Sequence, residues 1–147
     1  MDLRVSEAGA LTTPFSDRDW RSRLGLTWSR LLLAALFIFA GVMHFVVPAS
    51  YAAIVPQWLP NAPLLVVISG VAEILGGLGV LLPQTRRLAG WGLIALLVAV
   101  FPANIHMLQL GQTNHAPAYW MAALWLRLPL QLLMLWWVWR VAARPAR

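Results

Sequence analysis

The sequence predicts an all-α integral membrane protein, a four-helix bundle with both termini in the cytoplasm. The 147-residue chain is 61% hydrophobic and only 11% charged, with a mean hydropathy of +0.72. A soluble domain of this size cannot bury so much apolar surface. The apolar residues form four segments, each long enough to cross about 30 Å of hydrocarbon as a helix. All the cations are arginines, and most lie at the ends of these segments, as residues that set membrane topology do.

The predicted elements follow the hydropathy in order. Residues 1–27 are polar and are expected to be a flexible cytoplasmic tail, with no removable signal peptide because no small-residue cleavage site follows the first apolar run. Four spans follow, and each must be a helix because a strand exposed to lipid would leave its backbone unpaired. The transmembrane domain is predicted over residues 28–142, with spans at about 28–47, 62–82, 88–110 and 120–142 and a cytoplasmic tail at 143–147.

Helix signals support the second span. Asn61 can cap its start with Pro63 in the first turn, and Pro83 ends it. The third and fourth spans contain Pro102 and Pro129, which free the carbonyls of Val98 and Trp125. Two interpretations stay open: the freed carbonyls accept hydrogen bonds from nearby polar side chains, or proline is simply tolerated in a membrane helix.

Arginine placement predicts the orientation. The N-terminal tail, the turn "PQTRR" and the C-terminal tail are basic, whereas "PASYAAIVPQWLPN" and "GQTNHAPAY" contain no charged residue other than histidine. With four spans, all basic segments lie on one side, which places both termini in the cytoplasm. The first of the uncharged connections contains Pro48, Pro56 and Pro60, so it cannot be one helix and is expected to lie as a lid over the mouth of the bundle.

Glu73 interrupts the apolar run "ISGVAEILGG". A charge near the bilayer centre costs about 2.5–3.5 kcal/mol, so such residues face the bundle interior and pair with another group. Arg127 lies at a similar depth from the outer side and is the expected partner. Polar residues of all four helices fall in this outer half, and the candidate intramembrane polar site comprises Glu73, Arg127, His44, Asn104, His106, Gln131 and Ser69.

Several interpretations of this cluster stay open. It can be a buried ion pair of Glu73 and Arg127 that only fixes helix register, or a site for a small molecule or quinone head group. A b-type haem between His44 and His106 is disfavoured because each helix carries a single histidine, and no metal site or catalytic residue is predicted. The absence of cysteine excludes disulfides, thiolate catalysis and iron–sulfur ligation by cysteine.

Three segments together resemble the DoxX-like family of small four-helix bacterial membrane proteins: "GVMHFVVPASYAAIVPQWLP", "SGVAEILGGLGVLLPQTRRLAGWGLIALLVAVFPANIHM" and "RLPLQLLMLWW". The resemblance covers about residues 33–140 and implies a bundle in the bacterial inner membrane that serves an oxidoreductase. It implies no catalytic residue. The positions that match the family pattern are His44, Pro48, Tyr51, Pro56, Glu73, Gly76, Gly77, Arg86, Pro102 and Asn104.

The expected function is therefore an accessory subunit of a membrane redox system, without catalytic activity of its own. Its expected partners are membrane lipid, a quinone or a membrane oxidoreductase, and a homodimer is permitted. Nucleic acid is not expected, because no basic patch alternates with exposed aromatic residues. The alternatives are a small carrier, with Glu73 and Arg127 as its intramembrane site, and a purely structural membrane adaptor.

Overall fold

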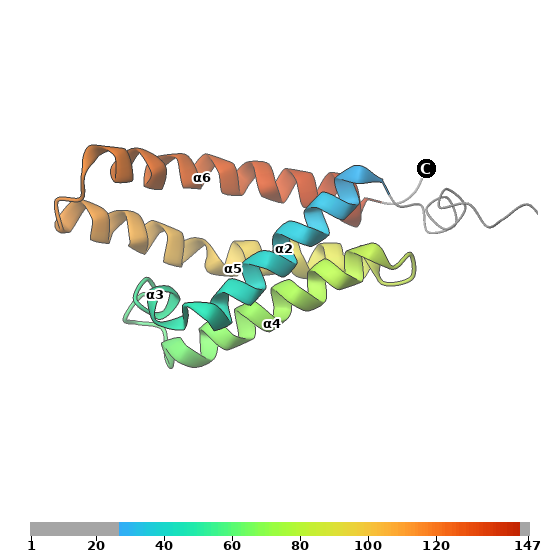
Figure 1. The fold of residues 1–147 in the computed structure, drawn as a ribbon, viewed down its shortest axis with the longest axis horizontal. Helices are drawn as coiled ribbons and strands as arrows, with labels where there is room; N and C mark the ends of the chain where they lie inside the picture. The colour runs from blue at the N-terminus through green and yellow to red at the C-terminus, as the bar shows by residue number, and fades with distance from the viewer. Residues whose placement is uncertain (1–26, 145–147) are drawn as a thin grey trace, which may run out of the picture.

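The computed structural model describes residues 27–144, which are helical with no β-strand among them (Figure 1). Four helices are long and apolar enough to cross a membrane, which confirms the all-α prediction. The predicted tails at 1–27 and 143–147 lie almost entirely outside the described residues. The elements are α2 (Trp28–Val46), α3 (Pro48–Ala52), α4 (Ala62–Leu81), α5 (Arg86–Thr113), α6 (Ala118–Val138) and the π-helical turn η1 (Trp139–Ala143).

The helices pack as two pairs, α2 with α4 and α5 with α6, which join where α4 lies against α5 (Figure 1). The start of α2, the α4–α5 turn and η1 lie at one end of the molecule, which we call the arginine end because Arg30, Arg86, Arg87 and Arg140 lie there. The short helix α3 and the α5–α6 connection lie at the other end, the loop end (Figure 1).

The boundaries of α4 follow the predicted signals. The Asn61 side chain caps the helix by accepting from the Leu64 amide at 3.3 Å, with Asn61 itself in the left-handed region at φ 50°. Pro63 lies in the first turn. Leu82, directly before Pro83, is extended and ends the helix, because proline disfavours the helical conformation of the residue before it.

Glycines allow α2 and α4 to cross at backbone distance. A Cβ added to Gly41 would lie 2.6 Å from the Gly70 carbonyl oxygen, and one added to Gly77 would lie 2.9 Å from the Ala34 carbonyl oxygen. Only residues without a side chain permit this approach, which is the usual means of close packing in membrane helices. A buried apolar cluster joins these two helices to α5, α6 and η1, and it comprises Leu33, Phe37, Val80, Leu93, Val138 and Ala142.

The chain after α6 continues as a π-helical turn rather than an α-helix. Its wider turn lays the backbone of Ala142 and Ala143 on Gly90, where an added Cβ would lie 2.8 Å from the Ala143 nitrogen. Ala142 and Ala143 are consequently fully buried. The end of the chain is thereby packed against the start of α5.

Candidate functional site

A cavity of about 390 Å³ lies in the half of the bundle nearer the loop end, and we call it the central cavity. Its walls come from α2, α4, α5 and α6 and from the chain between α2 and α4. Most of the lining is aliphatic. The exceptions are the polar and aromatic side chains of His44, Tyr51, Ser69, Glu73, Asn104 and Arg127. The predicted site residues therefore line one cavity, apart from His106 and Gln131.

Glu73 does not pair with Arg127, contrary to the expectation. The only ion-pair partner of its carboxyl group within residues 27–144 is His44, whose Nδ1 lies 3.4 Å from Oε2. That oxygen is buried and has no hydrogen-bond partner among the described residues. The Glu73 side chain is only 12% exposed. It therefore faces the central cavity with unused hydrogen-bonding capacity.

Arg127 is held instead by a chain of hydrogen bonds across α5 and α6. Its Nε donates to Asn104 Oδ1 at 2.8 Å, Asn104 Nδ2 donates to Gln131 Oε1 at 2.6 Å, and Gln131 Nε2 donates to the Leu97 carbonyl at 2.6 Å. Arginine can only donate and a carbonyl can only accept, so the two ends fix the orientation of both amides between them. We call these three bonds the Arg127–Leu97 chain.

The Arg127–Leu97 chain uses one nitrogen of the guanidinium, Nε, and leaves the two terminal nitrogens without a hydrogen bond in it. Within the described residues, Arg127 makes no hydrogen bond besides the one from Nε. Its two terminal nitrogens can therefore donate to a ligand in the central cavity. Gln131 does not line the cavity; it is 6% exposed and lies behind Asn104.

Of the two interpretations of the prolines, hydrogen bonding of a side chain to a freed carbonyl is not seen within residues 27–144. Gln131 on α6 donates to the carbonyl of Leu97 on α5. The carbonyl that Pro102 was expected to free is that of the next residue, Val98. Successive carbonyls in a helix point about 100° apart around its axis. The carbonyl of Leu97, not that of its neighbour, is directed toward Gln131 on α6.

His44 and Tyr51 form one aromatic wall. His44 Nδ1 lies 2.9 Å from the Ala40 carbonyl oxygen, and because that oxygen only accepts, Nδ1 carries the proton in this contact. The Tyr51 ring stacks on His44 with centroids 3.9 Å apart. Burial raises the pKa of Tyr51, the Glu73 charge raises it further, and Arg127 opposes both. The phenol is therefore neutral at pH 7 and can donate into the central cavity.

Tyr51 is not among the candidate site residues predicted from the sequence, although it lines the central cavity. Its side chain reaches the cavity because α2 stops at Val46 and the chain turns into α3. Residue patterns within one helix do not predict how a separate short helix folds back. The only signal in the sequence was the presence of Tyr51 among the positions that match the DoxX-like pattern.

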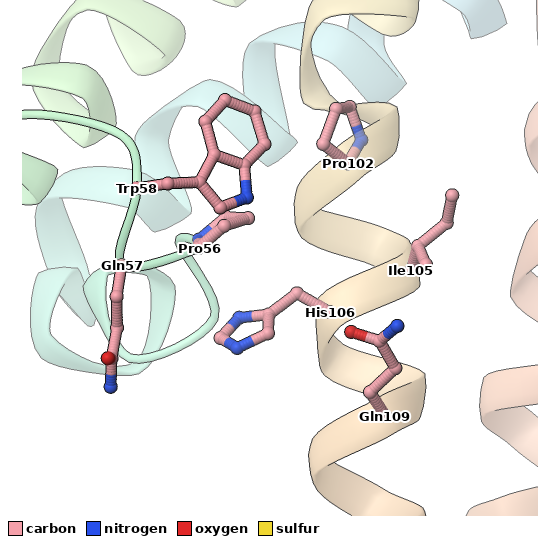
Figure 2. A pocket seen from close by; sticks show the side chains of 7 residues that line it. All are labelled: Pro56, Gln57, Trp58, Pro102, Ile105, His106 and Gln109. Atoms are coloured by element: carbon pink, nitrogen blue, oxygen red, sulfur yellow. The ribbon is translucent and has the colours of Figure 1, made fainter.

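His106 lies in a different pocket from the other candidate residues. Its Nδ1 is 2.9 Å from the Ile54 carbonyl oxygen, which ties the loop after α3 to α5. The second pocket, of about 420 Å³, opens between this loop and α5, and Figure 2 shows Trp58 and Pro56 facing Pro102 and His106 across it. His44 and His106 thus line separate pockets, and residues 27–144 contain no group of three or more His, Asp or Glu side chains placed to hold a metal ion.

The loop after α3 closes the central cavity on one side. Its residues Ile54, Val55 and Leu59 contribute to the lining together with Tyr51 of α3, as expected for a lid. The bond from His106 to Ile54 holds this segment against α5, so the lid is fixed by the same helix that carries Asn104.

Comparison with known proteins gives one match. A family model described as "Domain of unknown function (DUF8561)" matches residues 33–142, which include all of the candidate site residues. No curated protein matches the chain, and no solved structure matches it.

Proposed function

The chain belongs to the DUF8561 family, and we propose that it binds a small planar ligand of the quinone class in the central cavity, as an accessory subunit of a membrane redox system. One observation carries this proposal. The carboxyl of Glu73 and the guanidinium of Arg127 line the same cavity but do not pair with each other. A ligand between them can therefore bond to both.

The chemistry of the walls suits such a ligand. The cavity volume of about 390 Å³ falls within the range of about 300–1,000 Å³ that is usual for small-molecule sites. Its aliphatic lining can cover a ring, while Arg127 and Tyr51 offer donors to a quinone carbonyl. Glu73 offers an acceptor to the hydroxyl of a quinol. The oxidised and the reduced form each find complementary groups.

The redox role rests on the resemblance of three segments to DoxX-like proteins, since neither the family match nor any other comparison bears on it. The proposed partner is a quinone-reactive membrane oxidoreductase, and the chain itself performs no catalytic step. A second copy of the chain is an alternative partner. Most large apolar side chains of α6, including Trp125, Leu130 and Leu133, are exposed and are available to lipid or to either partner.

We also propose that the protein lies in the bacterial inner membrane with both termini in the cytoplasm. The support is the asymmetry of charge between the two ends of the molecule. Arg86 and Arg87 in the α4–α5 turn lie at the same end as Arg30 and Arg140 (Figure 1), whereas the connections at the loop end carry no arginine. Arginine-rich ends remain on the cytoplasmic side.

A carrier is the second candidate, and the buried Glu73 oxygen without a hydrogen-bond partner favours it. Carboxylates within membrane spans often mark the path of an ion or a proton. In this case the central cavity would hold a solute, and protonation of Glu73 would accompany its movement. Reconstituted vesicles would then take up the solute in a pH-dependent way that Glu73→Gln abolishes.

The test of quinone binding is a titration of the purified protein with a short-chain benzoquinone, followed by thermal shift or calorimetry. We expect saturable binding of the benzoquinone that weakens at least tenfold in Arg127→Gln. Binding of the corresponding benzoquinol should weaken at least tenfold in Glu73→Gln, since each variant loses a hydrogen bond to a charged group, worth about 1.5–3 kcal/mol. The matched control is Arg87→Gln, which removes the same charge from an exposed site outside the cavity.

The proposal fails if the wild-type protein does not bind the benzoquinone, or if all three variants bind it equally. Uptake of a solute without quinone binding would replace it with the carrier. A structural adaptor would do neither, and Glu73→Gln would leave the association with its partner unchanged.

A further inference from the structure

The arginine end contains a third pocket, which is basic and which the proposed function does not use. It has a volume of about 570 Å³ and lies where the start of α2, the start of α5 and the end of α6 converge. Its lining includes Arg30, Arg86 and Arg140 together with Trp136 and Trp137. We call it the arginine pocket.

The three arginines are held in three different ways. Arg30 is 3% exposed and donates through Nη2 to the carbonyls of Val80 and Leu81 at 2.8 and 3.2 Å, so its position is fixed by the end of α4. The Nε of Arg86 is buried and has no hydrogen-bond partner within residues 27–144. Arg140 is exposed and lies over the Trp136 ring at 5.4 Å.

Arg86 and Arg140 form no ion pair with an acidic residue within residues 27–144. Between residues 27 and 144 the only carboxylate side chain is that of Glu73, which lines the central cavity and lies about 12 Å from the end of α4, at 1.5 Å per residue. The like charges of Arg86 and Arg140 repel each other, and an anion bound between them would offset this repulsion. Arg86 keeps donors for such an anion, because its Nε has no hydrogen-bond partner within residues 27–144.

The pocket is bordered by both polar and apolar groups. Trp137 Nε1 donates to Ser29 Oγ at 2.8 Å, which joins α6 to α2 behind the arginines. One turn deeper along α6, Leu132 and Leu133 are 59% and 56% exposed. A polar head group in the pocket would therefore continue directly onto an apolar helix surface.

We propose that the arginine pocket binds a phosphate ester, namely the head group of an anionic phospholipid whose acyl chains lie along α6. Arginine suits this ligand because its planar fork bonds two phosphate oxygens at once. Tryptophans suit the same depth, since their rings prefer the membrane–water interface. Basic pockets between helix ends on the cytoplasmic side are the kind of site at which anionic head groups bind.

The test is native mass spectrometry of the full chain in mild detergent, with phosphatidylglycerol, phosphatidylcholine or soluble glycerol 3-phosphate added. We expect phosphatidylglycerol to bind in preference to phosphatidylcholine. Its affinity should fall about fivefold in Arg86→Gln and in Arg140→Gln, the contribution usual for one arginine near an anionic surface. Arg140 is exposed, so its variant should fold normally even if that of Arg86 does not.

Arg87→Gln is the matched control, because it removes the adjacent charge in the same turn but does not line the pocket. Equal losses in Arg86→Gln, Arg140→Gln and Arg87→Gln would indicate general electrostatic attraction and would overturn the proposal. So would equal binding of the two lipids. Binding of glycerol 3-phosphate at least as tightly as phosphatidylglycerol, with the same dependence on Arg86 and Arg140, would overturn the lipid and leave a soluble phosphate ester as the ligand.

Discussion

At the scale of single residues, the central cavity is defined by which polar groups are already bonded and which are not. Asn104 and Gln131 form their hydrogen bonds within the Arg127–Leu97 chain. Their role is therefore to position the guanidinium of Arg127. The Oε2 atom of Glu73 and the terminal nitrogens of Arg127 remain available for hydrogen bonds to a ligand. The division separates residues that support the cavity from residues that can bind within it.

The Arg127–Leu97 chain predicts the effect of Asn104→Leu. The substitution removes the acceptor for Arg127 and the donor to Gln131 Oε1, and leaves that buried oxygen unpaired. We expect the free energy of unfolding to fall by about 1–2 kcal/mol, at the upper end for hydrogen bonds between membrane helices. Denaturant unfolding in detergent measures it, and Gln109→Leu, at an exposed site on the same helix, should change stability little. Equal losses in both variants would contradict the chain.

The titration of Tyr51 reports the charges around the cavity. In a Tyr119→Phe background Tyr51 is the only tyrosine, and its absorbance change at 295 nm should have a midpoint above the usual value of about 10. The phenolate is negative, so Glu73→Gln removes one cause of the increase and should lower the pKa, whereas Arg127→Gln should raise it. Changes in the Tyr51 pKa of the opposite sign would contradict the placement of Glu73 and Arg127 beside Tyr51.

At the scale of elements, the crossing of α2 and α4 depends on glycine. In Gly41→Ala the new methyl group would meet the Gly70 carbonyl oxygen at 2.6 Å, and backbone atoms cannot move aside as a side chain can. We expect a loss of about 1–3 kcal/mol in the free energy of unfolding. Gly92→Ala is the control: its added Cβ meets nothing within 4 Å, so this variant should be neutral or more stable by about 0.5–1 kcal/mol. A neutral Gly41→Ala would contradict the crossing.

The sequence was sufficient to predict the elements but not their mutual rotation. Hydropathy located the four spans because the lipid-crossing length is fixed, and Asn61 and Pro83 marked the ends of α4 because capping is local chemistry. The prediction that Glu73 pairs with Arg127 was wrong because the sequence indicates how deep a residue lies along its helix but not which way its side chain points. The direction of the Arg127 side chain depends on its hydrogen bond to Asn104, a residue of a different helix. Likewise, nothing local indicated that η1 would dock on Gly90.

At the scale of the whole molecule, the two ends differ in charge and in packing. The arginine end contains most of the buried apolar cluster and the arginine pocket, and the loop end contains the central cavity and its lid. If the arginine end is cytoplasmic, the central cavity lies nearer the outer leaflet. A quinone that diffuses in the membrane would reach it without passing the charged end.

The proposed orientation can be tested directly because the natural chain has no cysteine. Single variants Gln57→Cys and Arg87→Cys place one thiol at each end, at exposed positions. We expect a membrane-impermeant maleimide to label Gln57→Cys in intact cells and Arg87→Cys only after permeabilisation. Labelling of Arg87→Cys alone in intact cells would invert the orientation, and labelling of both would contradict a span between them.

The central claim is that a ligand occupies the space between Glu73 and Arg127, and photolabelling tests it most directly. A photoreactive short-chain quinone would be irradiated with the purified protein, and the modified peptides identified by mass spectrometry. We expect labels on cavity residues of α4 and of the loop after α3, such as Ser69 and Val55, and we expect excess unlabelled quinone to suppress them. Labels confined to exposed residues outside the cavity, such as Leu75 and Trp125, and unaffected by competitor, would contradict the claim.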